Sequence, residues 1–225
     1  MRKRMSERRR EAVARSLLAT AIGCGLAAVA ATERTASGEV LAAWNFNGFN
    51  PQVDVTLNAD HGSGVLDLTQ VAAGAEAFTG TDVNAVGTDG PGFALSVVGQ
   101  NYNGRSIEFA ADTLGVERLT ISFAARTTAS GFVDSRLDAF VAGDWIEIGR
   151  FSGGSEWPLV RFEVDMPASV GFGSSAFRFV LDGATSSSGN IRIDNLRVES
   201  RVVPAPGALA LLGGAGLVAR RRRRR

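Results

Sequence analysis

His61 is the only histidine in the 225-residue sequence and the first residue to consider as a catalytic group. It lies in the polar segment Asn58–Gly64, after Asp60 and before Ser63. A Ser-His-Asp mechanism needs a histidine base that is held by an acid and faces a nucleophile. No serine in the sequence lies in a nucleophile-elbow pattern, so we interpret His61 as a solvated loop residue.

Other catalytic chemistry has little support. One histidine and one cysteine cannot supply the several nitrogen and sulfur ligands of a zinc site. No glycine-rich phosphate loop joins a strand to a helix. Twenty acidic residues lie between Glu39 and Ala219, and a glycosidase needs only two of them, but no pair stands out. Glycan hydrolysis therefore stays an alternative hypothesis.

Three aromatic residues lie where they could stack on sugar rings. Trp145 and Trp157 flank turns, and Tyr102 lies in an asparagine-rich turn. Packing at the edge of the domain is the alternative interpretation of all three. Trp44 differs, because it shares the alternating position of Val40, Ala42 and Phe46 and is predicted to lie in the core.

Apolar residues alternate with polar residues through most of residues 39–200. The pattern is clearest in Glu117–Arg126, Leu159–Asp165 and Ala176–Asp182, and turn sequences such as Asp89–Gly92 separate such segments. Strands with one apolar and one polar face form antiparallel sheets packed on a shared core. The sequence predicts one all-β domain, an antiparallel β-sandwich or jelly roll.

Two stretches depart from regular alternation. Asn50–Ala85 is irregular and predicts long loops with one strand near Val65–Thr69. In the last strand, Ile191 and Ile193 follow one parity, whereas Leu196 and Val198 follow the other. A β-bulge at Asp194 and Asn195 would put all four apolar residues in the core and turn the two polar residues toward a rim.

The N-terminal segment, residues 1–38, has the organisation of a secretory signal peptide. Basic residues up to Arg15 precede the uncharged run Ser16–Thr32, and small residues follow. Cleavage is expected after Ala31 or Gly38. Cys24 lies inside the apolar run, so we expect it to be removed with the signal; lipidation is the alternative. The mature domain would then contain no cysteine.

The C-terminal segment, residues 201–225, combines a proline motif, an apolar run and six arginines. Ala205–Ala219 has 15 uncharged residues, which as a helix would span ~22 Å of a ~30 Å hydrocarbon core. Arg220, Arg221 and Arg222 begin the flanking cluster, which predicts a short transmembrane helix.

Between Glu39 and Ala219 the net charge is about −10, so nucleic acid is not an expected partner.

The tail resembles the PEP-CTERM sorting signal of Gram-negative bacteria. The resemblance rests on Val203, Pro204, Ala205, Pro206 and Gly207, followed by the apolar run and terminal arginines. Ala205 stands where the namesake motif has glutamate. The resemblance implies export through the translocon, handling by an exosortase-type membrane protease, and transient or lasting membrane anchoring.

The domain itself is similar to the uncharacterised β-domains often attached to that tail. Trp44-Asn45-Phe46-Asn47 and the closing Ile193-Asp194-Asn195-Leu196 carry the similarity, and the closing strand also resembles that of galactose-binding-type jelly rolls, which include carbohydrate-binding modules. In those modules a structural calcium joins the first and last strands, which implies Asn45 or Asn47 with Asp194 as ligands here. Hydrogen bonds from Asp194 to the bulge are the alternative.

These features together predict a non-enzymatic exported protein of the cell envelope, cell surface or extracellular matrix. Extracellular polysaccharide is the expected contact of the β domain. The alternatives are a secreted glycan hydrolase and a carbohydrate-binding module.

Overall fold

The computed structural model describes residues 38–166 and 174–201. The predicted signal peptide and sorting tail lie outside these residues, apart from Gly38 and Arg201 at the boundaries. Among the described residues, no helix has the length and apolar character needed to cross a bilayer. The fold presented below is therefore that of the central domain.

The described residues form an all-β domain, as predicted. In chain order the strands are β1 (Val40–Trp44), β2 (Thr56–Asn58), β3 (His61–Gly62), β4 (Gly64–Asp67), β5 (Ala75–Thr79), β6 (Phe93–Val98), β7 (Ser106–Asp112), β8 (Arg118–Thr127), β9 (Ser135–Val141), β10 (Asp144–Phe151), β11 (Leu159–Asp165), β12 (Ser174–Val180) and β13 (Asn190–Ser200). Two short 3-10 turns, η1 (Ala72–Gly74) and η2 (Gln100–Tyr102), are the helical segments of the described part.

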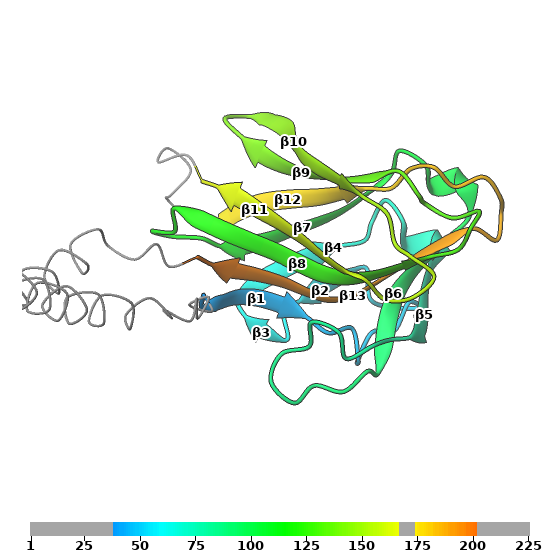
Figure 1. Cartoon of the computed structure of the whole chain (residues 1–225), viewed down its shortest axis with the longest axis horizontal. Coiled ribbons are helices and arrows are strands. Elements are labelled where there is room, and N and C mark those ends of the chain that lie inside the picture. The colour runs from blue at the N-terminus through cyan, green and yellow to red at the C-terminus, as the bar shows by residue number, and fades with distance from the viewer. Residues whose placement is uncertain (1–37, 167–173, 202–225) are drawn as a thin grey trace, which may run out of the picture. The chain divides into compact units, whose positions relative to one another are not determined.

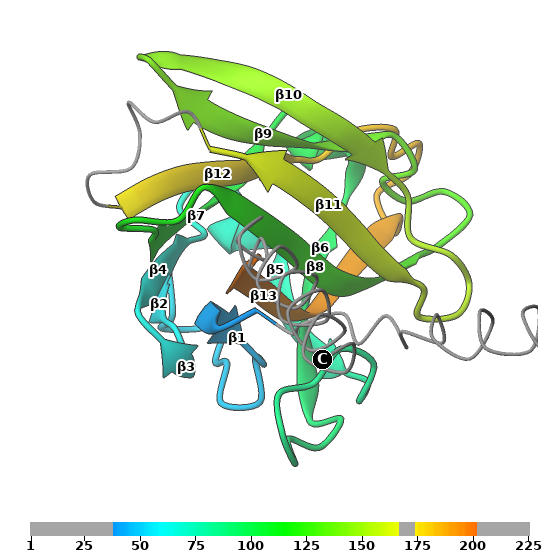
Figure 2. The same ribbon diagram turned by 60° about the vertical axis from the view of Figure 1, so that its left-hand side comes forward.

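The strands form two antiparallel sheets, one of seven strands and one of six. The seven-stranded sheet has the order β11-β8-β13-β1-β3, with β6 paired to β13 and β5 paired to β6. The six-stranded sheet has the order β10-β9-β12-β7-β4-β2. Figures 1 and 2 show the two sheets as facing layers, the arrangement that the alternating pattern predicts.

Aromatic rings from the two sheets meet in the core. Phe123 of β8 and Phe179 of β12 belong to opposite sheets, and their ring centroids are 4.7 Å apart. Trp44 of β1 lies 6.1 Å from Phe109 of β7 in an edge-to-face contact. Trp44 is 1% exposed, which confirms its predicted place in the core. Such contacts stabilise a core beyond the area that they bury.

The predicted bulge in β13 is confirmed. The register of β13 against β8 shifts between Asp194 and Arg197, and Asn195 adopts a positive φ of 50°. Ile191, Ile193, Leu196 and Val198 are all buried. The two sides of the bulge have different partners: residues before it pair with β6, and residues after it pair with β1.

The prediction that the bulge turns its polar residues toward a rim is wrong. Asp194 and Asn195 are 1% and 3% exposed. The Asn195 side chain donates to the carbonyl oxygens of Thr81 and Val83, at 2.7 and 3.0 Å. The chain before β6 therefore covers the bulge and satisfies its polar groups.

The predicted long loops of Asn50–Ala85 are only partly correct. Gly64–Asp67 forms β4 at the predicted strand, but β2, β3 and β5 also lie in this region. Each of these three strands has five residues or fewer, too short for alternation to be recognised in the sequence.

Candidate ligand-binding face of the six-stranded sheet

The outer face of the six-stranded sheet carries a continuous row of charged residues. In β9, Leu137 and Ala139 lie in the core, so Asp138 between them points outward. The residues paired in register with Asp138 on the neighbouring strands continue this outward-facing row over five strands. The residues of this polar row, from β4 to β10, are Asp67, Glu108, Arg178, Asp138 and Glu147.

Asp138 is the fixed centre of the polar row. Arg136 donates from Nε to one carboxylate oxygen at 3.0 Å, and Arg178 donates from Nε to the other at 2.9 Å. The Asp138 side chain is only 3% exposed because the two arginines cover it. Charge-assisted hydrogen bonds to both oxygens hold the two guanidinium groups in place.

The other acidic residues of the row also have donors. Glu108 accepts hydrogen bonds from Gln70 and Ser106 at 3.3 and 3.2 Å. Glu147 accepts from Arg150, which also donates to Asp134 at 2.8 Å. The row therefore presents carboxylate and guanidinium groups that are already oriented by the protein.

An apolar row lies beside the polar row. Its residues, each two positions along a strand from a member of the polar row, are Val65, Ala110, Ala176, Phe140 and Trp145. Phe140 is 42% exposed, and its ring centroid lies 5.2 Å from that of Trp145. Because Ala110 and Ala176 have short side chains, the sheet surface is lower between the aromatic pair and Val65.

Trp145 connects the two rows. The Arg178 guanidinium carbon lies 4.3 Å from the Trp145 ring centroid, a cation–π contact. Arg178 is in turn held by Asp138. We call the polar row and the apolar row together the Trp145 face. It combines an aromatic surface with fixed donors and acceptors on one face of a single sheet.

The structure does not bring the other two predicted sugar-stacking residues to this face. Trp157 lies half-buried in the loop between β10 and β11, whose Gly154 and Pro158 carbonyls bind β8 of the opposite sheet. Tyr102, in η2, is partly buried against the core, and its ring packs so closely on Gly74 that no side chain would fit there. Of the three, Trp145 alone shares a surface with the ordered ionic groups.

The predicted calcium ligands Asn45, Asn47 and Asp194 bind other groups of the chain. Asn45 Oδ1 accepts from the Asn47 amide at 3.0 Å, and Asn47 Oδ1 accepts from the Phe93 amide at 3.0 Å. No group of three or more His, Cys, Asp or Glu residues that could hold a metal occurs in the described residues. The oxygens of these three side chains thus accept hydrogen bonds from backbone amides, and calcium at Asn45, Asn47 and Asp194 stays a prediction.

Asp194 instead makes the hydrogen bonds expected of a bulge residue. Its Oδ2 accepts from the Thr81 amide at 2.7 Å and its Oδ1 from the Asn195 amide at 2.8 Å. Burial raises the pKa of Asp194 to about 7, although the two amides act in the opposite direction.

His61 lies in β3 and contacts an acid, but no nucleophile. Its Nε2 is 2.9 Å from Asp89 Oδ2, which also accepts from Asn45 Nδ2 at 3.1 Å. The hydrogen bonds from Asn45 and then from His61 hold the pKa of Asp89 below its usual range. Within the described part of the chain, no hydroxyl group hydrogen-bonds His61, so this pair does not form a catalytic triad.

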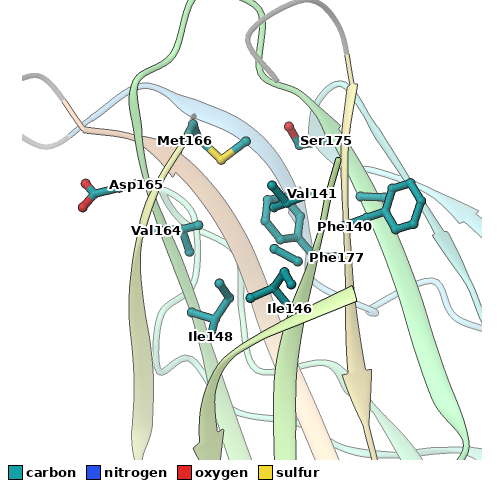
Figure 3. A pocket seen from close by; sticks show the side chains of 11 residues that line it. Phe140, Val141, Ile146, Ile148, Val164, Asp165, Met166, Ser175 and Phe177 are labelled. Atoms are coloured by element: carbon teal, nitrogen blue, oxygen red, sulfur yellow. The ribbon is translucent and has the colours of Figure 1, made fainter. Parts of the chain in front are cut away.

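An apolar cavity of about 240 Å³ opens between the edge strands β10 and β11. Figure 3 shows its walls, which include Ile146, Ile148, Val164, Met166 and Phe177. Its one charged lining residue, Asp165, is paired with Arg118 at 2.8 Å. The cavity lacks the several polar groups that recognition of a sugar requires.

No family model and no curated protein matches the chain. Among solved structures, the chain is similar to the N-terminal tandem of two family 22 carbohydrate-binding modules of Xyn10C from Paenibacillus barcinonensis (11% identity, TM-score 0.43, 76% of this chain, 47% of that chain). It spans about half of that tandem. It is also similar to the C-terminal family 22 module of Clostridium thermocellum Xyn10B (11% identity, TM-score 0.40, 73% and 96%). A third similar structure is TmCBM61 in complex with β-1,4-galactotriose (9% identity, TM-score 0.40, 69% and 94%). These sequence identities and TM-scores are too low to carry a conclusion about this chain.

Proposed function

We propose that this protein is a non-enzymatic, exported module of the cell surface or extracellular matrix that binds polysaccharide on the Trp145 face. The observation that carries the proposal is the contact of one apolar row with one polar row on the same sheet. A sugar ring has an apolar face of C–H groups and an edge of hydroxyl groups, so it needs both kinds of surface side by side.

Different residues of the Trp145 face can contact the apolar face and the hydroxyl groups of a sugar ring. The Trp145 and Phe140 rings supply apolar area at low cost in side-chain entropy. The guanidinium of Arg178 and the carboxylates of Glu108 and Glu147 can donate to and accept from hydroxyl groups. Because Asp138 already fixes Arg178, binding would order few additional side chains.

The part of the proposal that concerns export and sorting rests on the sequence alone. The signal peptide and the PEP-CTERM-like tail support delivery through the translocon to an exosortase and then to the envelope. In that location the protein would meet polysaccharide outside the cytoplasm.

The alternative of a glycan hydrolase gains no support from the face. A glycosidase needs one carboxyl group that is protonated at working pH and one that is ionised. The carboxylate oxygens of Asp138 and Glu147 already accept hydrogen bonds from arginine side chains. We therefore assign these carboxylates a binding role.

Affinity electrophoresis of the full chain in mild detergent, through gels containing xylan, β-glucan or galactan, tests the proposal. We expect retardation by at least one of these neutral glycans. Trp145→Ala should weaken that binding about tenfold, since a stacked aromatic ring contributes roughly 1–1.5 kcal/mol. Trp157→Ala is the matched control and should bind as the unaltered protein does. Equal losses in the two variants, or no retardation by any glycan, would overturn the proposal.

A further inference from the structure

The opposite face of the domain, on the seven-stranded sheet, places two arginines directly beside each other. Arg126 of β8 and Arg192 of β13 are cross-strand partners, so their side chains leave the same face. The register continues from Arg192 to Ser96 of β6 and from Ser96 to Glu76 of β5. Like charges in directly opposed positions repel each other.

Two residues of the row formed by Arg126, Arg192, Ser96 and Glu76 have buried polar atoms without hydrogen-bond partners. Ser96 is 0% exposed, and its hydroxyl oxygen has no partner within the described residues. The Arg192 Nε is likewise buried and unpartnered. The Arg192 guanidinium carbon lies 3.5 Å from the centroid of the Phe78 ring. Burial, and then the neighbouring Arg126, lower the pKa of Arg192. Glu76, at the end of the row, acts on Arg192 in the opposite direction, so the row holds two guanidinium groups and one carboxylate.

The other arginines of the domain show that this arrangement is an exception. All ten arginines between Glu39 and Ala219 are described. Six form ion pairs with carboxylates, namely Arg118, Arg136, Arg150, Arg178, Arg197 and Arg201. The described residues offer no carboxylate within ion-pair distance of the remaining four, which are Arg105, Arg126, Arg161 and Arg192.

Three of these four lie on one face. Arg161 of β11 is the cross-strand partner of Ser122 on β8, four residues before Arg126, so Arg161 and Arg126 point the same way. Both are exposed. Figure 1 shows β11, β8 and β13 side by side in this layer. Four residues of strand separate the two arginines by about 13 Å, too far for one small anion to contact both.

We propose that the outer face of the seven-stranded sheet is a second binding site, which takes an anionic polysaccharide through its carboxylate groups. Arg126 and Arg192 bind one carboxylate and Arg161 binds another along the same polymer. Local charge complementarity selects this occupant, because Arg126, Arg161 and Arg192 have no carboxylate partner within the described residues, although the domain as a whole is acidic. Guanidinium forks match carboxylate oxygens in pairs. A linear uronate polymer carries such a group on each sugar and can reach both positions.

The probe is polygalacturonate, with binding measured by biolayer interferometry on the full chain in detergent. Arg220–Arg225 are replaced by serine in every sample, because the six arginines would attract any polyanion. We expect Arg126→Ala to weaken binding about tenfold, as loss of a hydrogen-bonded charge does. Arg126→Ala/Arg161→Ala should weaken it further, and binding should fall as salt is raised. Arg105→Ala removes an exposed, unpaired arginine from another part of the domain and should have no effect.

Several outcomes would overturn the second site. These are unchanged binding in Arg126→Ala/Arg161→Ala, an equal loss in Arg105→Ala, or equal binding of neutral dextran. Binding of polyglutamate as strong as that of polygalacturonate would indicate an acidic protein partner instead of a polysaccharide. Trp145→Ala should leave polygalacturonate binding intact, so failure of this site and failure of the Trp145 face can be told apart.

Discussion

Asp194 shows how one buried carboxyl group makes stability depend on pH. In an unfolded chain its pKa would be near the ordinary value of 3.8, whereas burial raises the pKa in the folded domain to about 7. Between these two values the folded state binds the proton more strongly than the unfolded state. The free energy of unfolding contributed by this group therefore falls as pH rises from about 4 to about 7, and it is constant above that range.

Replacing Asp194 by asparagine should remove this pH dependence. The introduced amide keeps one acceptor oxygen but cannot ionise. We expect the melting temperature of the unaltered protein, relative to that of Asp194→Asn, to fall by at least about 3 °C between pH 4 and pH 7.5, the change that about 1 kcal/mol produces in a domain of this size. Calorimetry of both proteins across this range measures the difference. Parallel melting curves at every pH would show that the carboxyl group is ionised throughout.

At the scale of elements, the bulge in β13 lets one strand serve two partners. Before the bulge, Ile191 and Ile193 pair with β6; after it, Leu196 and Val198 pair with β1. The extra residue shifts the alternation of β13 by one position, so that Leu196 and Val198 face the core as Ile191 and Ile193 do. Asn195 makes this possible because its φ of 50° is accessible to asparagine and its side chain binds the chain before β6.

Two substitutions at Asn195 separate the backbone effect from the hydrogen bonds. Asn195→Gly keeps access to positive φ but loses the side-chain bonds to Thr81 and Val83, so we expect a loss of about 1–3 kcal/mol. Asn195→Val loses the same bonds and also strains a β-branched residue at positive φ, which should cost about 1–2 kcal/mol more. Urea unfolding compares the two variants. Equal losses would mean that the bulge relaxes and that backbone strain plays no part.

At the scale of the whole molecule, the two outer faces of the sandwich have different chemistry. One sheet carries arginines that are neutralised by carboxylates beside exposed aromatic rings. The other carries three arginines without carboxylate partners, next to paired ones such as Arg118 and Arg197. We propose that the first binds neutral glycan and the second binds acidic glycan. One module on the cell surface would then link two kinds of polymer, with the tail as its proposed address.

The predicted sorting tail should be separable from the fold. The last ladder contact of the described chain is the Arg201 amide with the Arg118 carbonyl oxygen at 2.8 Å, before the tail motif begins. Deleting residues 203–225 should therefore change the free energy of unfolding by less than about 0.5 kcal/mol. The same deletion should release the protein from the envelope into the medium, as cell fractionation would show. A large loss of stability with unchanged localisation would contradict this expectation.

The sequence by itself determined the strands and the faces that they bury. Alternation with period two is a local property, so Glu117–Arg126 and Leu159–Asp165 predicted β8 and β11 closely. A change of parity is also local, and it predicted the bulge at Asp194. The same pattern predicted Trp44 in the core.

The tertiary structure alone decided which polar residues meet. Asp138 and Arg178 are 40 positions apart and join only because β9 pairs with β12, and Arg126 meets Arg192 only because β8 pairs with β13. Strand order depends on the packing of the whole core and leaves no periodic signal in the sequence. For the same reason the sequence grouped Trp145 with Trp157 and Tyr102 by residue type, whereas the sheets put them on different surfaces. The buried state of Asp194 likewise depends on residues 80–83, a segment more than a hundred positions away that covers the bulge.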